Sequence, residues 1–216
     1  FELLGGLKAL VSDAIKFSGR HDAAPERPKS LDDYASLFRR IGLPPVARDY
    51  ADDAAFAAMR LGGPNPVVLR AADRLDDRFP LTDELFRDAL PGDTLAAAAA
   101  EGRLFLADYH LLANAECGDY PDGRKYLYAP LAAFALDRAT RRLRPVAIQC
   151  KQTPGPDNPV FTPRDGYNWL IAKTVVEVAD GNLHEAVTHL GLTHLLIEPF
   201  VIAAHRQLAP NHPLFR

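Results

Sequence analysis

The 216-residue chain has few of the features that define disulfide scaffolds, nucleic-acid binders or membrane proteins. Its two cysteines, Cys117 and Cys150, are too few for a disulfide framework, so we expect unpaired or buried thiols, with a single pairing as the alternative. The net charge of -3 provides no basic surface, and we expect no nucleic-acid partner. No uninterrupted apolar run reaches the roughly 18 residues that cross a bilayer, and no segment has the form of a signal peptide.

The composition indicates a globular protein with a substantial core, because 48% of the residues are apolar. Its enrichment in Ala, Arg, Asp and Pro indicates a bacterial source. We expect a soluble protein, either in the bacterial cytoplasm or secreted or periplasmic. The first residue is Phe1 rather than Met, which predicts a further segment upstream.

Hydrophobic periodicity predicts several helices, a small β unit and then one long helix. The shorter helices are expected over residues 2–17, 30–42, 49–61, 81–89 and 94–101. The second of them would begin with a capping box formed by Ser30 and Asp33. Extended segments are expected over residues 66–70, 103–110, 125–136 and 142–151, the last two forming a hairpin around 137–141. After an internal loop over 152–166, the long helix is expected over residues 165–200.

Three histidines, His184, His189 and His194, lie five residues apart in this long helix and are called here the histidine ladder. On an α-helix, residues five apart point roughly 140° away from each other, and metal-binding pairs use a spacing of four instead. A π-turn, with hydrogen bonds from i to i+5, suits the observed spacing and often occurs at functional sites. The ladder therefore predicts a local π-turn and a metal site for which iron, zinc, copper and nickel are all suitable. Structural or solvated histidines are the alternative.

The residues around the ladder resemble the lipoxygenase signature. The matching positions are Trp169, Ala172, Lys173, Asp180, His184, Glu185, His189, Thr193, His194, Leu195, Glu198, Pro199, Phe200, Ala203, Arg206, Leu208, His212 and Pro213. Segments 52–69, 102–112 and 125–136 are also similar to lipoxygenases, so the resemblance runs from about residue 50 to residue 216. It implies a mainly α fold, the N-terminal part of a large helical catalytic domain with a small β unit and a long iron-bearing helix that contains the π-turn.

The resemblance also implies roles for the ladder. The metal would be non-haem iron (Fe2+/Fe3+), with His189 and His194 as its ligands in this chain. His184 and Glu185 would lie around the metal without binding it, where such residues orient the ligands. For Glu185, an exposed helix carboxylate is the alternative.

Two further positions are candidates for contact with a fatty acid. Gly181 would deepen the acyl pocket, or else mark a backbone break at 180–182. Leu195 would touch the acyl chain, or else belong to the core. Lys173 and Asp180 are expected to be structural charges, a pairing between them being one option.

The activity implied by the resemblance is that of an enzyme, a lipoxygenase-type dioxygenase acting on polyunsaturated fatty acids and O2. A hydrogen atom leaves a bis-allylic carbon, O2 adds to the pentadienyl radical, and reduction of the peroxyl radical gives a hydroperoxide. One alternative is a truncated, non-catalytic module that binds lipid or protein. Another is a helical zinc hydrolase, although the chain has no H-E-x-x-H pair. A peripheral membrane contact is a further expectation.

In lipoxygenases the remaining iron ligands lie downstream of the ladder: a histidine, an asparagine or histidine four positions later, and the C-terminal carboxylate. The chain stops at Arg216, before any of these. We therefore expect residues 1–216 to form one partial catalytic domain, without the N-terminal β-barrel of plant and animal enzymes and without its C-terminal part. A complementary C-terminal polypeptide of the same enzyme would complete it.

Overall fold

The computed structural model describes residues 29–38, 41–120 and 123–215, and its contacts divide the chain into two units, residues 1–48 and 49–216. In the first unit a short 3₁₀ helix, η1 (Asp32–Leu37), lies within the segment predicted as a helix over 30–42. The predicted capping box is present: the Ser30 N–H donates to Asp33 Oδ2 (2.8 Å) and the Asp33 N–H donates to Ser30 Oγ (3.3 Å). The helix predicted over 2–17 lies outside the described residues.

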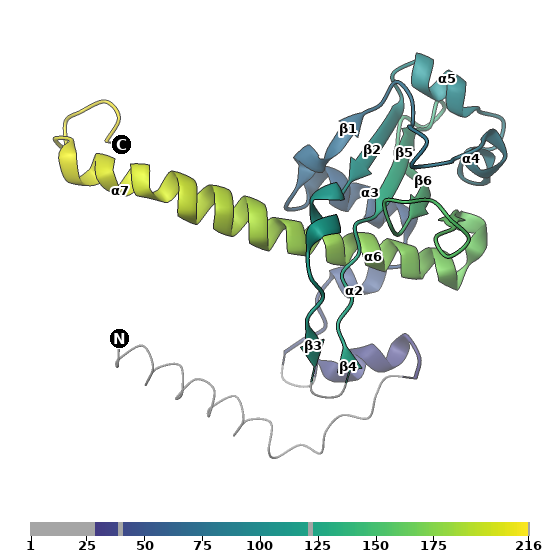
Figure 1. Ribbon diagram of the computed structural model, residues 1–216, viewed down its shortest axis with the longest axis horizontal. Coiled ribbons are helices and arrows are strands. Elements are labelled where there is room, and N and C mark those ends of the chain that lie inside the picture. The colour runs from purple at the N-terminus through teal and green to yellow at the C-terminus, as the bar shows by residue number, and fades with distance from the viewer. Residues whose placement is uncertain (1–28, 39–40, 121–122, 216) are drawn as a thin grey trace. The chain divides into compact units, whose positions relative to one another are not determined.

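The second unit is built on a five-stranded antiparallel sheet in the order β1-β2-β5-β6-β7 (Figure 1). Its strands are β1 (Leu69–Ala71), β2 (Leu104–Asp108), β5 (Leu131–Leu136), β6 (Leu143–Gln149) and β7 (Val160–Phe161). Two short strands, β3 (Asp119–Tyr120) and β4 (Gly123–Arg124), form a separate ribbon. The strand predicted over 103–110 and the hairpin around 137–141 are both confirmed, with Leu131 opposite Gln149 and Leu136 opposite Leu143.

Capping residues and prolines set bounds that periodicity alone did not predict. The helix expected over 49–61 is α3 (Asp53–Gly62), which starts late because the Asp52 carboxylate accepts from the Ala54 N–H (3.0 Å) and caps it. A separate short helix that was not predicted, α2 (Val46–Asp49), precedes it. The segment expected to be extended over 66–70 begins as a 3₁₀ turn, η2 (Pro66–Val68). Strand β5 begins only after Pro130, which has no N–H for a sheet hydrogen bond.

Helices cover both faces of the sheet, and this burial explains the uninterrupted apolar run 131–136. Side chains alternate along β5: Ala132 and Phe134 face α3 and the long helix, whereas Leu131 and Ala133 face the opposite core. The opposite core is covered by α4 (Asp83–Ala89) and α5 (Leu95–Ala100), close to where the sequence predicted them.

The long helix is continuous and consists of α6 (Tyr167–Leu183), the π-helix η5 (His184–Ile197) and α7 (Glu198–Gln207) (Figure 1). Its first part packs on the sheet through residues at helical spacing, namely Trp169, Ala172, Val176, Ala179 and Leu183. No residue of η5 or α7 is buried within the described chain.

The chain has no uninterrupted apolar run of roughly 18 residues. Even so, the 41-residue helix Tyr167–Gln207 is long and apolar enough to cross a membrane. Core helices of soluble proteins meet the same criterion, so length and composition do not identify a membrane span.

Candidate metal centre

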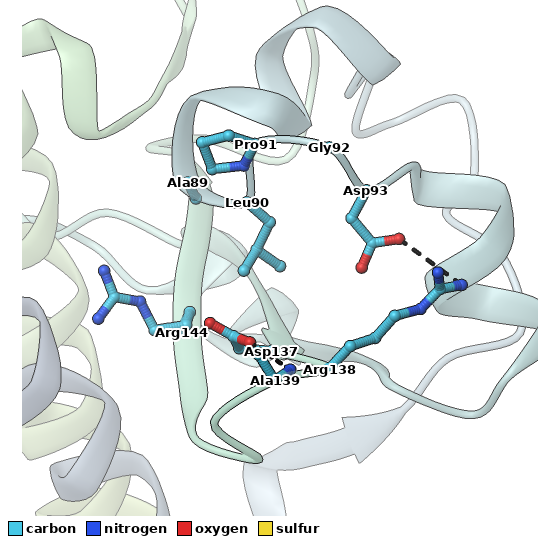
Figure 2. Close-up of a pocket in the computed structure, with 9 residues that line it drawn as sticks. All are labelled: Ala89, Leu90, Pro91, Gly92, Asp93, Asp137, Arg138, Ala139 and Arg144. Carbon is cyan, nitrogen blue, oxygen red and sulfur yellow. Dashed lines mark hydrogen bonds and ion pairs between the residues drawn. The ribbon is translucent and has the colours of Figure 1, made fainter.

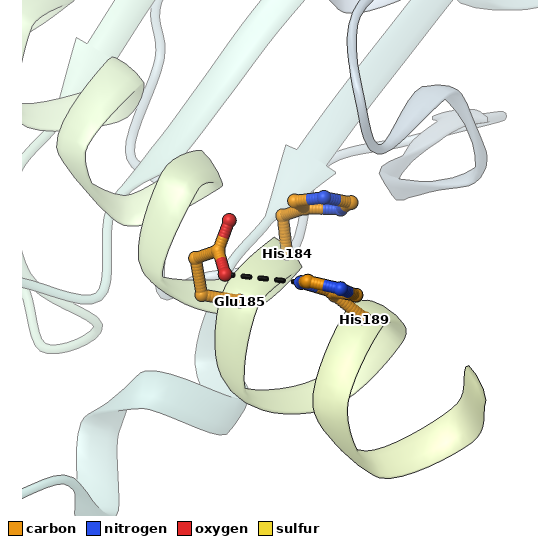
Figure 3. Close-up of side chains that lie close together, drawn as sticks. All are labelled: His184, Glu185 and His189. Atoms are coloured by element: carbon orange, nitrogen blue, oxygen red, sulfur yellow. Dashed lines mark hydrogen bonds and ion pairs between the residues drawn. The ribbon is translucent and has the colours of Figure 1, made fainter. Parts of the chain in front are cut away.

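The π-helix η5 brings the ladder histidines close together. The rings of His184 and His189 lie nearly parallel, at 14° with centroids 5.6 Å apart (Figure 3), and those of His189 and His194 are inclined at 57° with centroids 4.8 Å apart. The predicted π geometry is therefore present, and it extends over 14 residues rather than a single turn. Hydrogen bonding from i to i+5 places residues five apart on one face of the helix, as an α-helix would not.

His189 and His194 form a convergent pair, with their Nε2 atoms 3.0 Å apart. Their other ring nitrogens each face a glutamate carboxylate. His189 Nδ1 lies 3.1 Å from Glu185 Oε2, and His194 Nδ1 lies 2.6 Å from Glu198 Oε2. Each glutamate is four residues from its histidine, on the N-terminal side for His189 and on the C-terminal side for His194.

The hydrogen-bond chemistry of these contacts assigns the tautomers. An ionised carboxylate only accepts, so Nδ1 of each ring carries the hydrogen, and a neutral imidazole then has an unprotonated Nε2. Two lone pairs on His189 and His194 thus face each other at 3.0 Å and repel unless a cation lies between them. A shared proton or a metal ion meets this requirement, and an imidazole whose Nδ1–H is bound to a carboxylate is the usual metal ligand.

The separation also fits a metal. Nitrogen–metal bonds of about 2.1 Å at a right angle place the two nitrogens about 3.0 Å apart. The Nε2 atoms of His189 and His194 have that separation. His189 and His194 could therefore bind one metal ion through these two nitrogens.

A second grouping of possible ligands, His184, Glu185 and His189, has its donor atoms within 4.8 Å of one another (Figure 3). We favour the His189–His194 pair. A lone pair lies in the plane of its ring, so the nearly parallel rings of His184 and His189 hold their lone pairs in nearly parallel planes, which disfavours convergence on one ion. In addition, Glu185 already binds His189 Nδ1, and His184 Nδ1 lies 3.0 Å from Thr188 Oγ1.

Buried charges anchor the turn that precedes the ladder. Arg60, which is 3% exposed, lies 3.0 Å from Asp180 Oδ1 and donates to the Tyr109 hydroxyl (2.8 Å), which itself donates to Asp180 Oδ1 (2.8 Å). A further ion pair joins Arg60 Nη2 to Glu177 Oε2 at 2.5 Å. Helix α3, the residue that follows strand β2 and helix α6 are thereby joined.

The ionisation of this cluster follows from burial and charge together. Burial by itself would lower the pKa of Arg60, but the neighbouring Tyr109, Glu177 and Asp180 outweigh it and raise that pKa. Burial raises the pKa of Tyr109, so the phenol keeps its hydrogen and remains a donor. Burial also raises the pKa of Glu177, an effect that Arg60 opposes.

Lys173 and Asp180 are structural charges, but the predicted option of a pairing between them is wrong. Lys173 Nζ donates to Asp53 Oδ1 (2.7 Å) and to the Ala51 carbonyl (2.6 Å), whereas Asp180 binds Arg60. The indole of Trp169 also donates to Asp53 Oδ1 (2.8 Å). Residues seven apart on one helix lie on the same face but about two turns apart, so the two charges find partners at different points of α3.

At Gly181 and Leu195, the two candidate positions for contact with a fatty acid, the structure excludes the alternative interpretations, a backbone break and a place in the core. Helix α6 continues through Gly181, so there is no backbone break at 180–182, and a Cβ at Gly181 would meet nothing within 4 Å. Leu195 is 69% exposed and does not belong to the core of the described chain. Contact of either residue with a fatty acid stays a prediction.

Glu198 is the site residue to which sequence reasoning assigned no role. The signal was available, since Glu198 follows His194 by four residues just as Glu185 precedes His189 by four. The predicted orienting role was given to His184 and Glu185 only; the side chain of Glu185 is 70% exposed yet bonded to His189. His189 and His194 therefore each have a glutamate carboxylate at Nδ1.

A pocket of about 350 Å³ lies elsewhere, where the end of α4 meets the β5–β6 turn (Figure 2). Its charged residues include Asp93 and Arg138, which lie 3.9 Å apart, and Asp93 is also bound by Arg103 (2.7 Å). These partners satisfy each other, and the pocket contains none of the ladder residues.

Comparisons with known proteins agree on one family. The model of the family described as Lipoxygenase matches residues 47–216. The linoleate 9/13-lipoxygenase of Pseudomonas aeruginosa is 40% identical over 98% of this chain and 32% of its own length. The polyunsaturated fatty acid lipoxygenase ALOX15B of Rattus norvegicus is 40% identical over 87% of the chain and 28% of its own. The chain thus spans about a third of the length of these relatives.

Solved structures give the same result. A calcium-dependent 11R-lipoxygenase superimposes with a TM-score of 0.79 at 33% identity, over 89% of this chain and 29% of that one. The manganese lipoxygenase of Gaeumannomyces graminis superimposes with a TM-score of 0.70 at 28% identity, over 87% of this chain and 33% of that one.

Proposed function

The chain belongs to the lipoxygenase family, and from that premise we propose that it is the N-terminal part of the catalytic domain of an iron-dependent fatty-acid dioxygenase. The enzyme would convert a polyunsaturated fatty acid and O2 to a hydroperoxide. The observation that carries the proposal is the pair of Nε2 lone pairs on His189 and His194, 3.0 Å apart and each supported by a glutamate on the opposite ring nitrogen.

Each residue of the pair has a defined task. His189 and His194 would hold the metal through Nε2, while Glu185 and Glu198 keep a hydrogen on each Nδ1 and fix the plane of each ring. Iron, when bound, supplies the one-electron redox chemistry that hydrogen abstraction from a bis-allylic carbon requires. Leu195, next to the second ligand, would contact the acyl chain, and Gly181 would leave room for it.

We also propose that the exposed apolar side of the long helix is covered by a complementary C-terminal polypeptide of the same enzyme. Large apolar side chains, among them Leu195 and Phe200 at 69% exposure each, are solvent-exposed along η5 and α7. Exposed apolar surfaces of this kind favour association. The relatives are about three times as long as this chain, so they contain further polypeptide that could fill that role.

Metal analysis combined with a native mass spectrum of the purified protein tests these proposals. We expect about one iron per protein, little zinc or manganese, a bound second polypeptide, and O2 consumption with hydroperoxide formation when a polyunsaturated fatty acid is added. Zinc in place of iron would favour the hydrolase alternative. A protein that binds no metal and forms no product would contradict the enzymatic proposal and favour a non-catalytic module.

The carboxylate contact of the second ligand can be tested separately. Glu198→Gln keeps the size of the side chain but weakens the charge-assisted hydrogen bond to His194, so we expect iron affinity to fall by about 10–100-fold. Competition with a chelator of known affinity measures the change. Glu116→Gln is the matched control, since Glu116 is exposed and distant in sequence from the ladder, and it should retain wild-type affinity. Equal affinity in both variants would contradict an orienting role for Glu198.

A further inference from the structure

A buried amide, Asn65, connects the end of the α-helical segment to the π-helix. Asn65 lies between α3 and η2, is 4% exposed, and donates through Nδ2 to the main-chain carbonyl of Asp180 (2.7 Å). Its Oδ1 accepts from Thr188 Oγ1 (3.0 Å), two turns further along the long helix. One side chain thus spans the point at His184 where α6 ends and η5 begins.

Thr188 transmits this contact to the ladder. Its Oγ1 lies 3.0 Å from His184 Nδ1, and Thr188 directly precedes His189 in the chain. A hydroxyl has one hydrogen, and Asn65 Oδ1 and the His184 main-chain carbonyl, each 3.0 Å from Thr188 Oγ1, share it as acceptors. While Thr188 donates to either of them, it can only accept from His184 Nδ1. The ring of His184 is therefore held in one tautomer and one plane, and it stacks on the ring of His189 at 14°.

The other end of the connection is rigid. Asp180, whose carbonyl binds Asn65, has its own carboxylate held by Arg60 and by the Tyr109 hydroxyl, and all four residues are buried. Apart from Arg60 Nε, which has no hydrogen-bond partner, these contacts pair the buried polar groups with one another. A displacement would leave further buried groups unpaired, so such a network favours a single local arrangement.

We propose that Asn65 and Thr188 are positioning residues that fix His184, and through its stacked ring His189, in the geometry of the metal pair. The proposal rests on the proposed metal site and deepens it, since neither residue would touch the metal. The contacts form a relay from the Asp180 carbonyl through Asn65 and Thr188 to His184.

The test uses three substitutions in the intact protein. Thr188→Val has nearly the same shape without the hydroxyl, and Thr188→Ser retains the hydroxyl. Thr193→Val removes another hydroxyl of the same helix, one that donates to the Thr188 carbonyl (2.9 Å). We expect Thr188→Val to weaken iron binding by about 10–100-fold. Thr188→Ser should restore it, and Thr193→Val should leave it unchanged.

A readout on the metal-free protein separates this proposal from the metal site itself. Nitrogen NMR of the His184 ring should show protonated Nδ1 in wild type and Thr188→Ser, and a mixture of tautomers in Thr188→Val. If wild type binds no iron, the proposed function fails, and the NMR result alone decides whether the relay positions His184. An unchanged His184 ring in Thr188→Val, or an equal loss of iron affinity in Thr193→Val, would overturn the proposal.

Discussion

Replacing His189 or His194 by alanine is expected to abolish both iron retention and product formation. Each substitution removes one of two convergent Nε2 donors and leaves the other without its neighbour at 3.0 Å. Loss of a residue that merely orients a ligand typically weakens metal binding by about 10–100-fold, so loss of a ligand should cost at least the upper end of that range. Metal content after dialysis and O2 uptake with a polyunsaturated fatty acid measure the two effects.

His205→Ala is the matched control for these variants. His205 lies on the same long helix outside the ladder, and its ring packs against Phe215 with centroids 4.8 Å apart. This variant should retain iron and activity. Full activity in either ligand variant would refute the ligand assignment, whereas loss in all three variants would indicate a general dependence on the helix.

Arg60→Met is expected to cause the largest loss of stability, a decrease of about 3–5 kcal/mol in the free energy of unfolding. The substitution keeps much of the side-chain volume but removes the cation that Asp180 and Glu177 share. It leaves the buried Asp180 carboxylate and the half-buried Glu177 carboxylate without that partner. Denaturant-induced unfolding at neutral pH measures the change.

Two further variants test whether the loss of stability in Arg60→Met comes from the buried ion pair. Arg78→Met removes an arginine that is paired with Asp76 and Asp108 but is 45% exposed at its side chain, so it should cost no more than about 1 kcal/mol. Adding Asp180→Asn to Arg60→Met should recover part of the loss, because the unpaired buried charge is then absent. Equal losses in the Arg60 and Arg78 variants would show that burial of the cluster does not determine its contribution.

Local patterns in the sequence were sufficient for much of the fold. The alternation over 103–110 and the turn around 137–141 correctly predicted β2 and the β5–β6 hairpin, because strand pairing across a short turn depends on neighbouring residues. Bounds were less accurate where a single residue decides them, as at Asp52 and Pro130. A helix cap or a proline without an N–H fixes where an element begins, whatever the hydrophobic periodicity of the neighbouring residues.

For the candidate site, the sequence by itself determined the five-residue spacing of the ladder, which suits π geometry, and a surrounding motif whose resemblance implies His189 and His194 as the ligands. Only the tertiary structure decided which charges meet. Lys173 and Asp180 both lie in α6, yet their partners Asp53 and Arg60 are more than a hundred residues away in sequence, and no local pattern specifies such pairs. The same holds for Asn65, whose contact with Thr188 exists only because α3 and the long helix pack against one sheet face.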